Sequence, residues 1–195
     1  MEEFIRAIED RATTTENGLS TDACKAVTII YARGTNEAGN VGEVAGPPWF
    51  TVLRSSLTTA KVTVQGVDYS ATIAGYLGGG DATGSAKMLS LINQAASKCP
   101  STKIVLGGYS QGAQLVHNAA AKLTSAVTAQ IAAVVVFGDP NNGKAVGSVS
   151  SSLVKSFCHT QDVVCSGSGG YTTHLTYNTD ASAAGSFVVS TVGSV

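Results

Sequence analysis

Charge is scarce in this chain, and neither sign dominates. Only 13% of the 195 residues are charged, and 12 Lys and Arg against 13 Asp and Glu leave a net charge of −1. Without a run of basic residues, nucleic acid and anionic membranes are poor candidates for a partner. Long apolar runs are also missing: the longest, residues 131–137, falls far short of the roughly 20 residues of a membrane-spanning helix. The apolar content of 44% nevertheless suffices for one globular domain.

No C-x-x-C pair occurs among the four cysteines, which argues against zinc and thioredoxin-like sites, and we expect no metal. Four cysteines allow three pairings. We favour Cys24–Cys99 with Cys158–Cys165, because the close pair can hold one short loop rigid. Two disulfides indicate an oxidising compartment and hence a secreted, extracellular protein. The alternative is four free thiols buried in a cytosolic protein.

The first ten residues are charged and lack the apolar core of a secretory signal. We therefore expect a secreted form of this chain to be a mature or recombinant one. Residues 11–22 are polar and rich in threonine. We expect residues 1–22 to form a loose N-terminal arm and residues 23–195 to form a single domain, without internal repeats.

Short β-branched runs alternate with segments of helical periodicity. We expect strands at residues 25–31, 61–65, 103–106, 132–137 and 154–158. We expect helices at residues 47–56, 86–96, 111–123 and 181–192, and a loop over the Gly-rich residues 75–84. This alternation predicts an α/β fold: a doubly wound, mostly parallel, five-stranded sheet with helices on both faces.

The segment Gly108-Tyr109-Ser110-Gln111-Gly112 fits the pattern G-x-S-x-G. The pattern alone is weak in a chain with 22 glycines, but here it lies between an expected buried strand and an expected helix. Glycines at the flanking positions let strand and helix pass closely, while the strained turn exposes the serine hydroxyl beside a helix N-terminus. The context predicts that Ser110 is the nucleophile of a serine hydrolase.

A serine nucleophile needs a base, and three histidines are available. His117 follows Ser110 by seven residues on the same expected helix, two turns or roughly 10 Å away. His159 adjoins Cys158, near the expected disulfide. His174 comes last and best fits the chain order Ser, acid, His of α/β-hydrolases. We interpret the other two as ordinary helix-surface and loop histidines.

Two carboxylates compete for the role of the acid, since Asp139 and Asp162 both follow an expected strand and precede His174. Asp162 lies inside the expected Cys158–Cys165 ring, which can hold a side chain that must orient an imidazole. Asp139-Pro140 also reads as a turn initiator. The residues alone therefore favour Asp162 but leave Asp139 open.

Four segments together resemble the fungal cutinases over most of the chain. They are residues 30–40, the Lys98-Cys99-Pro100 segment, residues 107–113, and residues 157–165 with His174-Leu175. The resemblance implies a small, lidless α/β-hydrolase with an exposed active site. It also implies a monomer without a cofactor that acts on cutin and on short-chain soluble esters.

Carried over by position, the resemblance makes Ser110 the nucleophile, His174 the general base and acid, and Asp162 the orienting carboxylate. It places the oxyanion hole at the backbone N–H groups of Thr35 and Gln111. The family usually has serine at the first of these positions, and threonine keeps the hydroxyl. The resemblance also supports the disulfides Cys24–Cys99 and Cys158–Cys165.

Two segments depart from the family pattern. Residues 166–173 are small and polar where typical cutinases are apolar, which predicts a weaker hydrophobic grip on the acyl chain. Residues 139–142 resemble the corresponding stretch of the related acetylxylan esterases. An esterase that deacetylates polysaccharides is therefore the alternative to a cutinase, and a hydrolase-like binding protein without catalysis is the non-enzymatic one.

Overall fold

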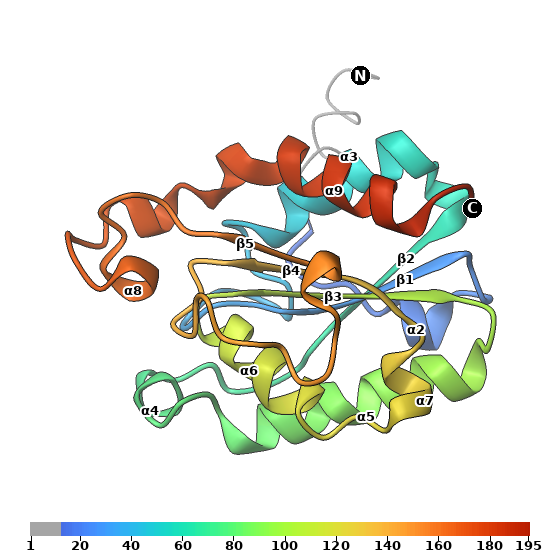
Figure 1. Ribbon diagram of the computed structural model, residues 1–195, viewed down its shortest axis with the longest axis horizontal. Helices are drawn as coiled ribbons and strands as arrows, with labels where there is room; N and C mark the ends of the chain where they lie inside the picture. Colours follow the sequence, from blue (N-terminus) through green and yellow to red (C-terminus); the bar gives the residue numbers. More distant parts are fainter. Residues whose placement is uncertain (1–12) are drawn as a thin grey trace, which may run out of the picture.

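Five parallel strands form the centre of the molecule in the computed structural model, which describes residues 13–195 (Figure 1). Along the chain they are β1 (Val27–Ala32), β2 (Val62–Gly66), β3 (Lys103–Tyr109), β4 (Ile131–Phe137) and β5 (Val154–Phe157). Their spatial order is β2-β1-β3-β4-β5, and every neighbouring pair is parallel. The predicted α/β fold with a five-stranded sheet is confirmed.

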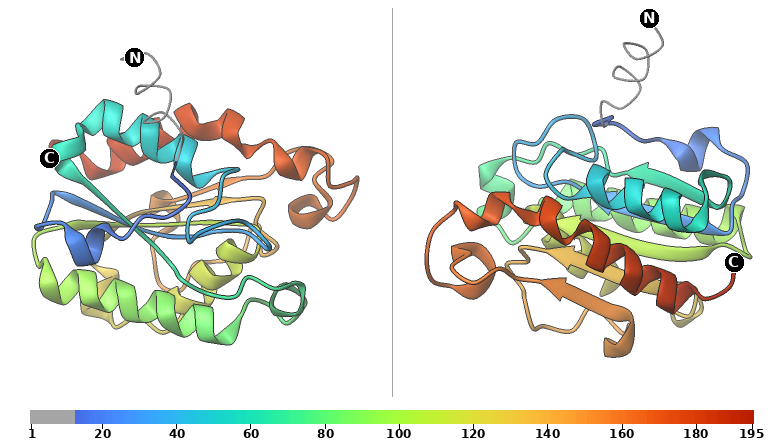
Figure 2. Two further views of the ribbon diagram at one scale, coloured as in Figure 1. Left: turned by 180° about the vertical axis from the view of Figure 1, so that it is seen from behind. Right: turned by 90° about the horizontal axis from the view of Figure 1, so that it is seen from above.

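Helices cover both faces of this sheet. On one face, α3 (Gly46–Leu57) lies beside α9 (Ala181–Val192), as the view from above in Figure 2 shows. The opposite face carries α5 (Ala82–Lys98) and α6 (Gln111–Ala120) (Figure 1). Each layer has its own apolar core, with Trp49 and Leu53 on the first face and Met88 and Ile92 on the second. Strands enclosed in this way read as continuous apolar runs, which is why they were visible in the sequence.

The remaining elements are short. They are the α-helices α2 (Gly18–Thr21), α4 (Ile73–Leu77), α7 (Ser125–Thr128) and α8 (Val163–Ser166), and the 3₁₀ turns Thr59–Lys61, Ser151–Leu153, Thr173–Leu175 and Tyr177–Asp180. Both α4 and α8 lie at the end of the molecule toward which the parallel strands point (Figure 1). Within residues 13–195, no helix combines the length and the apolar character needed to cross a bilayer.

The expected loop over residues 75–84 is wrong in most of its length. Helix α4 continues to Leu77 and α5 begins at Ala82, so only residues 78–81 are non-helical. Two caps override the low helix propensity of the glycines. The Thr72 side chain accepts a hydrogen bond from the Gly75 backbone N–H, and Asp81 accepts one from the Gly84 N–H.

Part of the expected N-terminal arm packs against the domain. Leu19 is buried in the core, and the Glu16 carbonyl accepts a hydrogen bond of 2.9 Å from the backbone N–H of Gly66 at the end of edge strand β2. The Glu16 carboxylate also forms an ion pair with Arg54 on α3. Residues 13–22 thus cover an open edge of the sheet, and residues 1–12 of the expected arm lie outside the described residues.

Candidate active site

The G-x-S-x-G segment forms a sharp turn between β3 and α6, with Ser110 at its apex. Ser110 has φ 56° and ψ −121°, a conformation that costs free energy in a residue with a side chain. The glycines on either side, Gly108 and Gly112, have no room for a side chain. A Cβ on Gly108 would lie 2.4 Å from the Gly112 carbonyl oxygen, and a Cβ on Gly112 would lie 2.0 Å from that of Ala32. The glycines therefore allow the crossing that exposes the Ser110 hydroxyl at the carboxyl end of β3.

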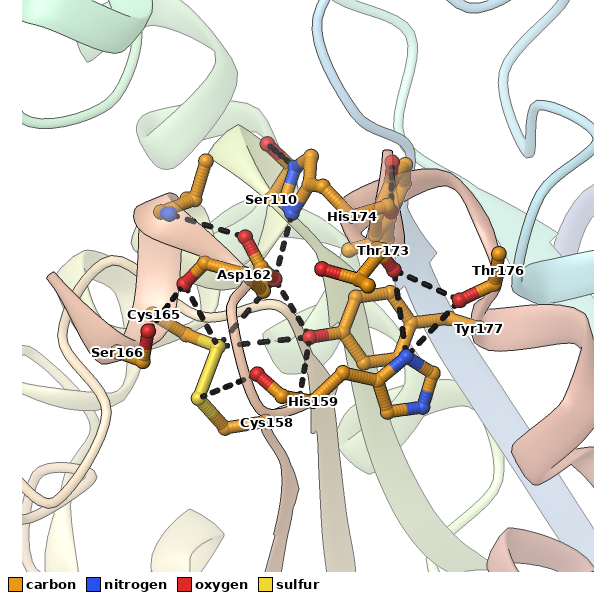
Figure 3. Close-up of polar contacts among 12 residues, drawn as sticks. Ser110, Cys158, His159, Asp162, Cys165, Ser166, Thr173, His174, Thr176 and Tyr177 are labelled. Atoms are coloured by element: carbon orange, nitrogen blue, oxygen red, sulfur yellow. Dashed lines mark hydrogen bonds and ion pairs between the residues drawn. A yellow bond between two sulfur atoms is a disulfide. The ribbon is translucent and has the colours of Figure 1, made fainter. Parts of the chain in front are cut away.

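His174 and Asp162 lie in line with this hydroxyl, as the dashed contacts in Figure 3 show. The Ser110 Oγ is 2.9 Å from His174 Nε2, and His174 Nδ1 is 2.8 Å from Asp162 Oδ2. An ionised carboxylate can only accept, so Nδ1 carries the proton and Nε2 is left to accept from Ser110. The structure thus brings together the three side chains that the sequence predicted as a triad.

Asp162 is fully buried, at 0% exposure, yet its negative charge is well supported. It caps helix α8, where its Oδ1 accepts a hydrogen bond from the Val164 backbone N–H at 2.9 Å. Its Oδ2 accepts from His174 and, at 2.6 Å, from the Tyr177 hydroxyl. Burial raises the pKa of Asp162, but the hydrogen bonds from His174, Tyr177 and Val164 outweigh it, so that the pKa lies below its usual value.

The disulfides have the expected pairing, Cys24–Cys99 and Cys158–Cys165. The second joins two cysteines that are only 7 positions apart in the sequence, and Asp162 lies within the ring that it closes. The Cys165 sulfur is 3.3 Å from Asp162 Oδ2, so the ring restrains the acid directly. Between residues 13 and 195, no three His, Cys, Asp or Glu side chains are grouped so that they could hold a metal ion.

Thr35 and Gln111, the expected oxyanion hole, lie side by side. Among the hydrogen bonds of the described residues, none uses the backbone N–H of either. The Gln111 side-chain amide donates to the Thr35 hydroxyl at 2.8 Å and to the Thr72 carbonyl at 2.9 Å. The Thr35 hydroxyl accepts a hydrogen bond in this contact, so it can still donate its own proton to another acceptor. This arrangement leaves two backbone donors and one hydroxyl donor near Ser110.

The loop that presents Thr35 is held by a carboxylate that sequence reasoning missed. Glu37 accepts hydrogen bonds from three backbone N–H groups: that of Gly34 at 2.8 Å and those of Glu43 and Val44, each at 2.9 Å. A glutamate in a Gly-rich loop carries no local signal for this role, because its partners come from both sides of the loop. The loop geometry around Thr35 depends on this partly buried cluster of hydrogen bonds.

The other two histidines are paired with carboxylates away from Ser110. His117 Nε2 is 2.7 Å from Asp139 Oδ2, so the competing acid Asp139 serves a different histidine. His159 Nε2 contacts Asp180, and its ring stacks on Tyr177 with centroids 4.2 Å apart. The expectation that His117 and His159 are simply surface or loop residues missed these two pairs, which join segments distant in sequence.

A pocket of about 320 Å³ opens beside Ser110. Its lining is mainly apolar or aromatic: Thr35, Ile73, Tyr76, Tyr109, Ser110, Val164, Tyr171, His174 and Leu175. Ile73, Tyr171 and Leu175 are also 59%, 66% and 62% exposed, which is unusual for large apolar side chains. Residues 166–173 therefore contribute one large aromatic side chain, Tyr171, to this lining, and Ile73 of α4 and Leu175 add two aliphatic ones.

Comparison with known proteins agrees with this geometry. A family model described as Cutinase matches residues 23–192. A cutinase of Blumeria hordei is 52% identical over 180 residues, which cover 91% of this chain and 76% of the relative. A cutinase of Monilinia fructicola is 50% identical over 173 residues, with 88% of this chain and 86% of the relative covered.

Solved structures give the same result. A Trichoderma reesei cutinase in complex with a phosphonate inhibitor superposes with a TM-score of 0.87 at 40% identity, covering 98% of this chain and 86% of that one. An acetylxylan esterase superposes with a TM-score of 0.75 at 24% identity, covering 87% and 100%, which shows a shared fold. The chain therefore belongs to the cutinase family and is a carboxylic ester hydrolase.

Proposed function

We propose that this protein is a secreted, monomeric serine esterase that hydrolyses carboxylic esters of cutin, the polyester of the plant cuticle, and short-chain soluble esters. The observation that carries the proposal is the hydrogen-bonded line Ser110–His174–Asp162, of which Ser110 and His174 line a mainly apolar pocket. The two disulfides of the protein favour an oxidising, extracellular environment.

Ester cleavage begins at the Ser110 hydroxyl, 2.9 Å from His174 Nε2. His174 takes the hydroxyl proton as Oγ attacks the ester carbonyl, and Asp162 stabilises the imidazolium that forms. The alcohol leaves with the proton from His174, which leaves the acyl group on Ser110. Water then gives a proton to the same histidine and attacks the acyl-enzyme. The bond from the acyl carbon to Ser110 Oγ breaks, the acid is released, and His174 returns the proton to Oγ.

Negative charge develops on the carbonyl oxygen in both steps. The backbone N–H groups of Thr35 and Gln111 and the Thr35 hydroxyl are the donors that would receive it. Because the Gln111 amide already fixes the Thr35 hydroxyl at 2.8 Å, this donor needs little reorganisation when the tetrahedral intermediate forms. The N-terminus of α6 adds the positive end of a helix dipole at the same place.

The pocket surroundings support an apolar polyester over an acetylated polysaccharide as substrate. Ile73, Tyr171 and Leu175 form an exposed apolar rim at the pocket, suited to aliphatic chains at a solid surface. The polar residues 166–170 next to this rim favour the alternative, a deacetylase that acts on polysaccharide. The acyl group would differ in size, since a cutin esterase releases a long aliphatic acid and a deacetylase releases acetate.

A substrate comparison tests the proposal. Purified protein and its Ser110→Ala variant are assayed on p-nitrophenyl butyrate, cutin and acetylated xylan. We expect release of nitrophenol and of cutin monomers by the wild type and none above background by the variant. Acetate release from xylan without cutin monomers would identify the deacetylase instead. Full butyrate turnover by Ser110→Ala would refute the serine mechanism itself.

A further inference from the structure

Tyr177 lies directly beneath the catalytic line, three residues after His174. It is fully buried and does not line the substrate pocket. Its hydroxyl donates a hydrogen bond of 2.6 Å to Asp162 Oδ2, the same oxygen that lies 2.8 Å from His174 Nδ1 (Figure 3). The phenol and the imidazole therefore share one carboxylate oxygen, and neither can change its bond without affecting the other.

The Tyr177 side chain is held so that its proton points at Asp162. Its hydroxyl oxygen accepts the His159 backbone N–H at 3.0 Å. The His159 ring stacks on the phenol, and Phe137 contacts it on a different side with ring centroids 6.2 Å apart. The His159 ring is itself held by Asp180. With its lone pair engaged by this N–H, the hydroxyl is oriented to donate to the carboxylate.

The hydroxyl keeps its proton across the working range of an esterase. Burial, and then the hydrogen bond to Asp162, raise the pKa of Tyr177 well above its ordinary value of 10. A hydrogen bond donated to a carboxylate draws negative charge toward the donor. Less charge is then left on Asp162 to stabilise a proton on His174.

We propose that Tyr177 is a positioning residue of the triad, which fixes the orientation of Asp162 and moderates the negative charge that Asp162 presents to His174. The inference rests on the proposed roles of Ser110, His174 and Asp162. The titratable groups that face Tyr177 are Asp162, His159, His174, Tyr109 and Asp180. Of these, only Asp162 accepts the hydroxyl proton, so the effect passes through this carboxylate.

Replacement Tyr177→Phe removes the hydroxyl and keeps the ring in its aromatic surroundings. We expect kcat on p-nitrophenyl butyrate to fall roughly tenfold and KM to remain unchanged. This loss is smaller than the roughly hundredfold loss that a 1 Å misplacement of a catalytic group can cause. We also expect the acid limb of the kcat/KM profile, which reports the free enzyme's base, to move up by about half a pH unit. A stronger Asp162–His174 interaction in the variant is the physical cause of this shift.

The matched control is Tyr109→Phe. It removes another buried hydroxyl that bonds to His174, at 2.8 Å, but to its backbone carbonyl and not through the carboxylate. This variant should leave the acid limb where it is, whatever its effect on rate. As a second test, 3,5-difluorotyrosine at position 177 provides a more acidic phenol and a stronger donor. It should move the acid limb to lower pH, opposite to the shift in Tyr177→Phe.

Thermal unfolding of each variant separates loss of fold from loss of positioning. If Tyr177→Phe stays folded and its acid limb coincides with that of the wild type, or if the fluorinated residue shifts the limb upward, the inference is overturned. These results leave the proposed function intact as long as Ser110→Ala is inactive. Activity in Ser110→Ala would instead overturn the proposed function, so the two failures are distinguishable.

Discussion

Asp162 and Asp139 are a natural pair for a test of the catalytic acid. Both carboxylates are buried, at 0% and 2% exposure, and each contacts a histidine, at 2.8 and 2.7 Å. Each also accepts a backbone N–H two residues further on. Replacing either with asparagine removes the same charge from a similar environment. Only Asp162 faces the histidine that contacts Ser110.

In Asp162→Asn the amide must present either its oxygen or its NH₂ group to His174. If the NH₂ group faces Nδ1, the imidazole carries its proton on Nε2 and can no longer accept from Ser110. The charge that stabilises the imidazolium is lost in either orientation. We expect kcat/KM to fall about 10⁴-fold, as in triads generally. This loss corresponds to about 5 kcal/mol of transition-state stabilisation.

Asp139→Asn should behave differently. Its partner His117 lies on α6 and does not touch the pocket. The loss of one buried charged hydrogen bond should lower the free energy of unfolding by about 1–3 kcal/mol while kcat changes less than about threefold. Initial rates on p-nitrophenyl butyrate and urea unfolding give both quantities. Equal losses of kcat/KM in two folded variants would refute the assignment of the acid.

Three further outcomes are expected. Gly112→Ala places a Cβ 2.0 Å from the Ala32 carbonyl oxygen, so it should lower the free energy of unfolding in urea by at least about 3 kcal/mol. An unchanged urea midpoint would contradict the close crossing of β3 and α6. The two cysteines of the Cys24–Cys99 disulfide are 75 positions apart, and replacing both with serine should lower the free energy of unfolding by about 4 kcal/mol while kcat is preserved. The cysteines of Cys158–Cys165 are 7 positions apart, and the same replacement there should cost about 2 kcal/mol and also lower kcat. Because the folded-state pKa of Asp162 is lowered from 3.8, its contribution to stability is complete above that pH and is lost as the pH falls through the folded-state pKa. The stability difference between wild type and Asp162→Asn should therefore shrink on acidification, and a difference that grows would show the opposite sign.

Local sequence indicated the main elements and the proposed nucleophile, Ser110. The apolar runs of β1, β3 and β4 stand out because helices bury these strands on both faces. The glycines on either side of Ser110 are readable because the requirement is local: the crossing of β3 and α6 leaves no space for a Cβ. Short segments with small residues are harder to predict, since Thr72 and Asp81 cap helices where the glycines indicate a loop.

The tertiary structure decided which distant side chains meet. Asp139 and Asp162 both follow a strand and precede His174, and only the folded chain assigns one to His117 and the other to His174. The support of Asp162 by Tyr177 likewise depends on a contact across the fold. Sequence patterns report periodicity and backbone requirements, which are local, whereas hydrogen bonds between loops depend on where the strands end. For this reason the sequence predicted the chemistry at Ser110, and only the structure showed how the proposed acid, Asp162, is held.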